Sequence, residues 1–203
     1  QMGIRACWVK HYTVTTQSSC LDAILGNILQ EQFNPPRPDT IWCSDITYIW
    51  TTEGFVYLAS IMDLFSRKII AWNLSRKLDA SGIIRMIQMA KQTRNPGHLV
   101  VIHTDRGCQY LSQSYIKETA QMCHSYSKKG YPWDNACIES FHALIKREWL
   151  NRCKIENYQQ AYMLVFEYIN TFYNTVRIHS HCNYMSPNDY EKLYANYKKK
   201  AAL

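Results

Sequence analysis

The ten residues "IWCSDITYIW", at positions 41–50, have the composition of a β-strand and carry one acid. They are rich in β-branched and aromatic residues, and they contain neither glycine nor proline. Apolar residues occupy both alternating sets of positions, which is typical of a strand covered on both faces. Asp45 lies in the middle of the stretch, and a carboxylate there is costly unless something pairs with it. The partner of Asp45 is therefore the first question that the sequence raises.

The composition favours one compact domain with short extensions. The chain has 203 residues, of which 47% are apolar, and a net charge of +7 that mildly favours a polyanionic partner. Its eight cysteines include no C-x-x-C pair, which argues against a zinc ribbon. We see no signal peptide and no long apolar segment, so we expect no membrane association and a reducing, cytoplasmic location. Because the chain begins at Gln1, we expect further sequence upstream.

The order of predicted elements around this strand indicates an α/β fold. We expect strands at 41–50, 55–65, 69–75, 98–103 and 124–127. We expect helices after three capping residues, Asp79, Ser112 and Asp134, the second running to about residue 122 and the third to about residue 150. The first three strands are joined by turns short enough for an antiparallel meander. The order β-β-β-α-β-α-β-α predicts a mixed five-stranded sheet flanked by helices.

The two ends of the chain are expected to lie outside this core. Residues 1–18 are interpreted as an arm, and Ser19 as the cap of a helix with one apolar stripe, namely Leu21, Ile24, Leu25, Ile28 and Leu29. "NPPRPD", at 34–39, predicts a stiff, extended linker. We therefore divide the chain into 1–38, 39–153 and 154–203. The last part has an amphipathic helix over about 158–172, a capping box at 186–189 and a basic tail.

Two further acids stand out beside Asp45. Asp105 follows directly on a buried strand, where α/β sheets present strand ends to ligands. Glu139 lies on a predicted helix, on one line with Asn135, His142 and Lys146. Three carboxylates gathered at one end of a sheet would repel one another, and divalent magnesium or manganese would relieve that repulsion. Two such ions can activate a nucleophile and stabilise a leaving oxygen on a phosphodiester.

Each acid also has an ordinary structural interpretation. A strand aspartate is often a hydrogen-bonded structural residue, Asp105 suits a turn, and Glu139 suits a solvated helix face. Asp63, at the hairpin "DLFSRK", is interpreted as a turn residue. The joint arrangement of the other three on this order of elements is what favours a site.

Five motifs in the same order carry a family resemblance. They are "WCSDITYI", "DLFSRKIIAW", "HTDRGCQY", "KKGYPWDNACIESFHALIKRE" and "FYNTVRIHS" with "YMSPNDYE". Over about residues 38–195 the chain resembles the integrase-core transposases of bacterial insertion sequences and, more distantly, retroviral integrases. The resemblance implies a ribonuclease H-like fold, with an N-terminal arm and a C-terminal helical extension around the catalytic core.

The resemblance also implies a DNA strand-transfer enzyme. Asp45, Asp105 and Glu139 match the family's acidic triad and would hold two Mg²⁺ or Mn²⁺ ions. Water would nick DNA at the element's end, and the freed 3′-hydroxyl would attack another phosphodiester. The expected partners are transposon-end and target DNA and further copies of the chain. An upstream helix-turn-helix product is expected to supply end recognition.

Six residues are predicted to contact DNA: Lys146, Lys128, Lys129, Tyr131, Asn135 and Arg147. Lys146 matches a family position that suggests an end-DNA contact, but a solvated helix lysine is the alternative. A basic loop with an aromatic residue suits phosphates and bases, although a solvated flexible loop fits as well. Asn135 is alternatively a helix cap. Arg177 and His179 are left open between packing and DNA contact. His181 and Cys182 are not assigned to a metal because no fourth ligand is in sight.

One departure from the family pattern leaves two other functions open. Only 33 residues separate Asp105 from Glu139, slightly fewer than the family usually has, with the shortening near Cys123 and His124. A deletion there would displace the helix and leave an inactive DNA-binding remnant. A structure-specific nuclease of the same fold, which cleaves RNA–DNA hybrids or junctions without joining them, is the other alternative.

Overall fold

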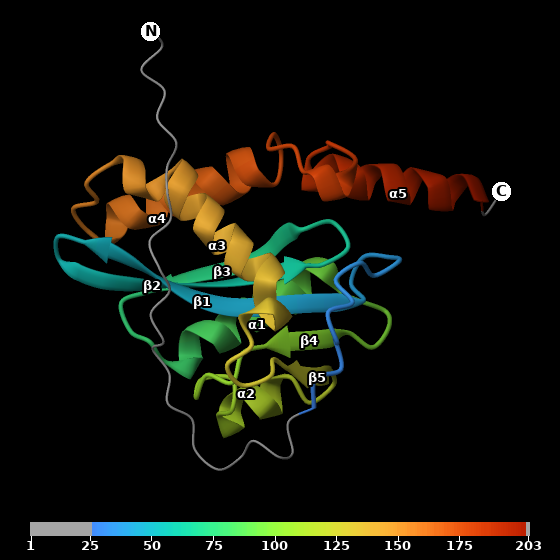
Figure 1. Cartoon of the computed structure of the whole chain (residues 1–203), viewed down its shortest axis with the longest axis horizontal. Helices are drawn as coiled ribbons and strands as arrows, with labels where there is room; N and C mark the ends of the chain where they lie inside the picture. Colours follow the sequence, from blue (N-terminus) through green and yellow to red (C-terminus); the bar gives the residue numbers. More distant parts are fainter. Residues whose placement is uncertain (1–25, 202–203) are drawn as a thin grey trace, which may run out of the picture.

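A mixed five-stranded sheet forms the centre of the computed structural model, which describes residues 26–201 (Figure 1). The strands are β1 (Ile41–Thr51), β2 (Gly54–Asp63), β3 (Lys68–Ser75), β4 (Val101–Thr104) and β5 (Cys123–Tyr126). Their order across the sheet is β3-β2-β1-β4-β5. β1, β2 and β3 form the predicted antiparallel meander, and β4 and β5 continue the sheet in parallel with β1. The predicted α/β fold with a mixed five-stranded sheet is therefore confirmed.

Helices cover both faces of this sheet (Figure 1). They are α1 (Ala80–Arg94), α2 (Gln113–Glu118), α3 (Ala136–Glu148), α4 (Tyr158–Phe166) and α5 (Pro187–Ala201), with short 3₁₀ turns at Pro132–Asn135, Leu150–Arg152 and Ser180–Cys182. Successive β1 side chains point to opposite faces, so Trp42 enters the core under α1 and α2, whereas Cys43 enters the core under α3 and α4. Among the described residues, no helix is long and apolar enough to cross a bilayer.

Two of the three predicted helix caps are confirmed, and the third is wrong. The Asp79 carboxylate accepts the N–H groups of Ser81 and Gly82, and Ser112 caps α2. Asp134 instead lies inside the 3₁₀ turn that precedes α3 and is buried. Its Oδ2 accepts the N–H of Lys128 at 2.7 Å, so it closes the loop before the helix. Asp134 resembled a cap in the sequence because a capping acid and an acid that closes the preceding loop both lie just before the first turn of a helix.

The helix predicted from Ser19 does not extend through Ile28 and Leu29. Both N–H groups donate to the hydroxyl of Ser125, at 2.9 and 3.1 Å, and neither residue is helical. Just before them, Gly26 accepts the N–H of Tyr126 on β5. The backbone here bonds to the edge of the sheet, and this tertiary contact overrides helical propensity. The remainder of that predicted helix and the predicted arm at 1–18 lie outside the described residues.

The junction between α2 and β5 is tightly bonded. α2 ends at Glu118, earlier than predicted, and the side chain of Thr119 bonds to the ring of His124 at 2.8 Å. β5 nevertheless pairs with β4 over its whole length without a shift. The sheet thus shows no distortion at Cys123 and His124, where the sequence suggested a shortening.

The predicted amphipathic helix at 158–172 forms, but with a change of pitch. α4 continues directly into a π-helical segment, Glu167–Tyr173. Ala161, Val165 and Ile169 of the predicted stripe are buried, whereas Tyr162 remains 38% exposed. The wider turn brings the rings of Tyr168 and Tyr173 into the core instead. At the end of the chain, Ser186 caps α5 as the sequence predicted, by accepting the N–H of Asp189.

Arg94, at the end of α1, joins three separate parts of the chain. Its guanidinium pairs with Asp39 at 2.7 Å, Asp63 at 2.9 Å and Glu191 at 2.8 Å. Asp63 also accepts the N–H of Phe65, which confirms its predicted turn role. Burial raises the pKa of Asp63 to about 6, against the lowering effect of its backbone hydrogen bonds and of Arg94. The 34–39 segment is not helical, as predicted, but it is not extended throughout: residues 36–39 bend and turn, Asp39 has a φ of 60°, and the end of the segment is fixed to α1 through this cluster.

Replacing Arg94 with alanine is expected to destabilise the protein strongly. The substitution leaves the fully buried Asp63 without its ionic partner, and breaking a buried pair in this way costs about 3–5 kcal/mol. Urea unfolding at neutral pH measures the change.

Arg76→Ala is the matched control, since Arg76 pairs with Glu53 at the surface, where both side chains are more than half exposed. It is expected to cost less than about 1 kcal/mol. Equal losses for the two variants would show that the Arg94 cluster has no special role in stability.

Candidate active site

The sheet places Asp45 and Asp105 side by side. The parallel pairing of β1 with β4 ends at Ser44 and Thr104, and each acid is the next residue of its chain. Neighbouring strands lie about 4.8 Å apart, so the two acids leave the paired region at the same level. Asp45 is opposite Ser60 of β2 on its other side. Two carboxylates distant in sequence are therefore neighbours where the parallel pairing ends.

Helix α3 brings Glu139 to the same region. The helix is anchored by a buried stripe of Ile138, Phe141 and Ile145, while Glu139 itself remains exposed beside it. One turn further on, the Nδ1 atom of the buried His142 lies 3.2 Å from Asp45 Oδ2. The charges of Asp45 and Asp105 both act on Glu139. The three predicted acids thus share one region of the molecule.

His142 fixes the helix to the strand. Its second ring nitrogen, Nε2, lies 3.3 Å from the hydroxyl of Ser60, so the ring bridges adjacent positions of β1 and β2. The sequence placed His142 on the polar line of the helix without a role. Its i, i+3 spacing from Glu139 was the available signal, because this spacing puts both side chains on one side of the helix.

Burial and neighbouring charge raise the pKa values of Asp105 and Glu139. Burial raises the pKa of Asp105 to about 6, the charge of Asp45 adds to the rise, and the N–H of Gly107 opposes it. Although Glu139 as a whole residue is exposed, desolvation of its carboxyl group, and then the charges of Asp45 and Asp105, raise its pKa to about 7. Concentrated negative charge at a strand end is an unfavourable arrangement that a cation would relieve.

The donor atoms and charge of this cluster fit a hard divalent cation. All three side chains offer carboxylate oxygens, which are the ligands that magnesium and manganese prefer. Over residues 26–201, however, no three acidic, histidine or cysteine side chains stand close enough to form a ready-made metal site.

The predicted DNA contacts lie in two places. Lys146 is on α3, two turns beyond Glu139, with its ammonium group 4.4 Å above the ring of Tyr48. Arg147, next on the helix, is exposed. Lys128 and Tyr131 belong to the loop before α3, where the lysine ammonium group lies 5.5 Å from the tyrosine ring, and Lys129 is exposed in the same loop.

Asn135 differs from the other predicted DNA contacts because its side chain is buried. It is 3% exposed, and its Oδ1 has no hydrogen-bond partner among the described residues. Its side chain also makes no capping bond to α3, which argues against the alternative role. Its contribution to DNA binding stays a prediction.

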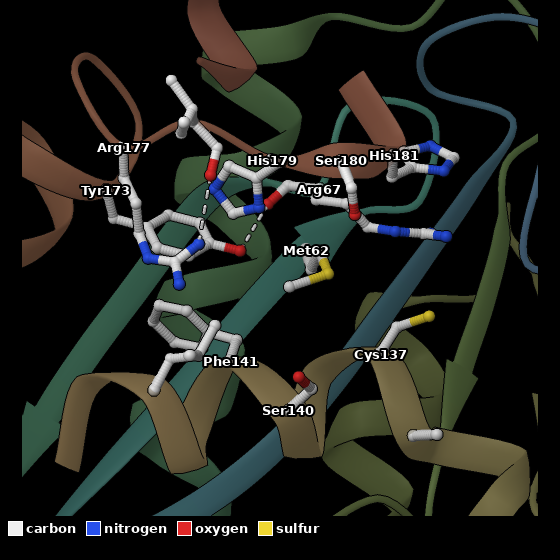
Figure 2. A pocket seen from close by; sticks show the side chains of 13 residues that line it. Met62, Arg67, Cys137, Ser140, Phe141, Tyr173, Arg177, His179, Ser180 and His181 are labelled. Atoms are coloured by element: carbon white, nitrogen blue, oxygen red, sulfur yellow. Dashed lines mark hydrogen bonds between the residues drawn. The ribbon is translucent and has the colours of Figure 1, made fainter. Parts of the chain in front are cut away.

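The motif that contains Arg177 and His179 lines a cavity of about 480 Å³ between α3 and the segment after the π-helix (Figure 2). Arg177 makes two charged hydrogen bonds with Glu148, at 2.7 and 2.9 Å. His179 packs against the ring of Tyr173, with 4.8 Å between ring centres. These contacts favour packing, which is one of the two roles that the sequence left open. His181 and Cys182 bond to the carbonyl oxygens of Phe65 and Ser66.

Two models of the integrase core domain match the chain, over residues 35–132 and 120–187. The transposase for insertion sequence element IS904 of Lactococcus lactis is 39% identical over 168 residues, which cover 82% of this chain and 66% of that protein. Transposase InsF for insertion sequence IS3A of Escherichia coli is 38% identical, with 94% and 67% covered. The insertion element IS600 31 kDa protein of Shigella sonnei is 31% identical, with 96% and 72% covered. The chain therefore spans about two thirds of the length of these relatives.

Solved structures support the same fold. The HTLV-2 integrase catalytic core domain in complex with magnesium is similar with a TM-score of 0.58 at 17% identity, and the match covers 78% of this chain and 99% of that one. The catalytic domain of the Mos1 mariner transposase gives a TM-score of 0.52 at 11% identity, with 66% and 71% covered. The predicted ribonuclease H-like fold is confirmed by these similarities.

The pKa shift of Asp105 predicts a pH-dependent difference between the wild-type protein and Asp105→Asn. With a native pKa of about 6 against an ordinary 3.8, the folded state holds a proton that the unfolded state has released, so its contribution to stability falls as pH rises from 4 to 7. Without added metal, the variant should therefore gain up to about 3 kcal/mol relative to the wild type over this range. Urea unfolding in EDTA at several pH values measures this.

The difference between the two proteins is the informative quantity. Burial lowers the pKa values of His103 and His179 to about 4, so both proteins gain stability from these residues over the same range. Asp189→Asn serves as the control, because its hydrogen bonds lower the pKa of Asp189 and its difference from wild type should be constant above pH 5. A constant difference for Asp105→Asn as well would contradict the raised pKa of Asp105.

Proposed function

The chain belongs to the integrase-core family of insertion-sequence transposases, and from this premise we propose that it nicks DNA at the end of a mobile element and transfers the freed strand to a new site. Residues 39–153 form the catalytic core in this proposal, with 1–38 as an N-terminal segment and 154–203 as a helical extension. The observation that carries the proposal is the convergence of Asp45, Asp105 and Glu139 where the parallel pairing of β1 and β4 ends.

The three carboxylates are the proposed ligands of two Mg²⁺ or Mn²⁺ ions. When bound, such ions activate a nucleophile and stabilise the leaving oxygen of a phosphodiester. The chain's own contribution is to hold the carboxylates. His142 fixes the orientation of Asp45, the N–H of Gly107 holds one oxygen of Asp105 at 2.9 Å, and the buried stripe of α3 sets the position of Glu139.

The proposed reaction has two chemically equivalent steps. In the first, water attacks phosphorus, the bond to the 3′-oxygen breaks, and a 3′-hydroxyl and a 5′-phosphate result. In the second, this 3′-hydroxyl attacks another phosphodiester, so a new P–O bond forms and another 3′-hydroxyl is released. One set of carboxylates serves both steps, because each is an in-line displacement at a phosphodiester.

DNA is proposed to approach along α3 and the loop before it. Lys146 and Arg147 follow Glu139 on the helix, and Lys128, Lys129 and Tyr131 precede it. Basic side chains on both sides of the acidic cluster suit a strand whose backbone crosses it. Because transposition handles two ends, we propose that the chain acts as an oligomer on DNA in the bacterial cytoplasm, together with an upstream helix-turn-helix product.

Asp45→Asn, Asp105→Asn and Glu139→Gln are each expected to abolish strand transfer while leaving the fold intact. Each substitution removes a charge that would hold the metals and keeps the shape of the side chain. The measurement is the yield of joined products from element-end DNA with magnesium or manganese. Thermal unfolding with and without Mn²⁺ gives a second readout, since the ion should stabilise only the wild-type protein.

Glu167→Gln is the control, because Glu167 is an exposed acid on the π-helical segment and should keep full activity. Wild-type levels of joining in any of the three triad variants would show that the site assignment is wrong. For the wild-type protein, cleavage without joining would favour a structure-specific nuclease, and binding without cleavage would favour an inactive remnant.

Lys146→Ala is expected to weaken DNA binding and to reduce its salt dependence. A lysine that neutralises one phosphate contributes about one unit to the slope of log K against log salt concentration. Binding to end DNA over a range of salt concentrations measures this slope. Lys192→Ala, at an exposed position of α5, should leave the slope unchanged, and an unchanged slope for Lys146→Ala would reject the contact.

A further inference from the structure

Three aromatic side chains are exposed together at the far end of the β1–β2 hairpin. Tyr48 is 56% exposed, Trp50 62% and Phe55 49%. Phe55 is the cross-strand partner of Trp50, with ring centres 4.8 Å apart at 71°, and it meets Tyr48 at 5.4 Å and 80°. Large apolar rings gathered in contact at a surface mark a binding site more often than single exposed residues do.

A groove lies beside these rings. β4 pairs with β1 only through Ser44, so no strand of the described chain covers that edge of β1 beyond this residue. The end of α3 and the turn after it form the other wall, and the groove has a volume of about 310 Å³. Its lining includes Tyr48, Trp50, Lys146, Leu150, Asn151 and Lys154. This volume is at the small end of ligand pockets, which favours one nucleotide over a duplex.

The chemistry of the groove is aromatic with basic side chains. The ammonium group of Lys146 lies above the Tyr48 ring, and Lys154 is exposed nearby in the lining. Aromatic platforms combined with lysines are the usual means of holding single-stranded nucleic acid, because every base has a face that can stack and every nucleotide carries a phosphate.

The groove lies further along the same two elements as the acidic cluster. Tyr48 points to the face of β1 opposite Asp45, and Lys146 reaches it across the edge of β1 that no described strand covers. Tyr48 is three residues beyond Asp45 on β1, which is about 10 Å along the strand. Lys146 is seven residues beyond Glu139 on α3, which is also about 10 Å along the helix. The same two elements therefore carry both features, at a separation of about three stacked nucleotides.

From these observations we propose that the groove binds one unpaired nucleotide of the DNA strand held at the acidic cluster, with its base stacked on Trp50 and its phosphate facing Lys146. The contact between Phe55 and Trp50 is edge-to-face, so at least one face of the indole is not covered by Phe55. Phe55 supports the indole directly, and Tyr48 contacts Phe55. This proposal rests on the proposed function in that the DNA reaches the groove from the catalytic region.

The test is the binding of a short, labelled single-stranded oligonucleotide and of the matching duplex to the full chain in EDTA. Trp50→Ala is expected to weaken single-strand binding by roughly 5- to 100-fold, the range for losing one stacked base. Duplex binding should change by less than about twofold. Trp50→Phe, which keeps an aromatic ring, should restore most of the affinity for the single strand.

An abasic scan identifies the stacked base. One abasic position should weaken binding to the wild-type protein as much as Trp50→Ala does, and should cause no further loss in that variant. Met89→Ala removes an equally exposed apolar side chain, 49% accessible, from α1, outside the lining of the groove, and should bind like the wild type. Thermal unfolding checks that each variant is folded.

Equal losses for single strand and duplex, or no loss, would overturn the proposal. So would a Trp50→Ala variant that changes the oligomeric state but binds the oligonucleotide normally, since the rings would then contact a second copy of the chain. Because the assay contains no metal and needs no joining, its result is independent of the strand-transfer experiment. If the wild-type protein failed to join DNA, but Trp50→Ala still weakened single-strand binding and left duplex binding unchanged, only the proposed function would be contradicted.

Discussion

The early end of the parallel pairing between β1 and β4 is the constraint on which the rest of the structure depends. β1 runs from Ile41 to Thr51, yet β4 accompanies it only as far as Ser44. Asp45 is the first residue past this point, and Asp105 is the equivalent residue of β4. The sheet therefore supplies two neighbouring carboxylates without a special loop, and it leaves the remaining length of β1 open to α3 and to solvent.

The conspicuous acids of this protein have two different kinds of surroundings. Asp63 receives a permanent counter-charge from Arg94 and two backbone donors, so it contributes to structure. Asp45 lies beside a histidine. Burial and the charge of Asp45 raise the pKa of Asp105, and desolvation with the charges of Asp45 and Asp105 raises the pKa of Glu139. Crowding of like charge is unfavourable for a structural role and suitable for binding cations. This contrast separates Asp63, which occurs in an equally conspicuous motif, from the acids of the candidate site.

The sequence predicted the sheet, the order of its elements and the region where the three acids meet, because these depend on local patterns and on strand order. It failed where distant contacts decide. Asp134 closes a loop instead of capping α3, and Ile28 and Leu29 bond to Ser125 instead of forming a helix. The contacts of His142 and the exposure of Trp50 were missed for the same reason, since both depend on which elements lie beside them. The sequence of β1 predicts a strand covered on both faces, so the exposure of Trp50 could not be predicted without knowing that β4 ends its pairing at Ser44.

The Arg94 cluster has a mechanical consequence. Asp39 ends the proline-rich segment, Asp63 ends β2, and Glu191 lies on α5, so one guanidinium links all three to the end of α1. A force on the chain ahead of Asp39 is therefore transmitted through the ion pairs of Arg94 to the folded domain, and is not absorbed by a flexible linker. Tension applied to the chain ahead of Asp39 would therefore load α5 and the sheet together.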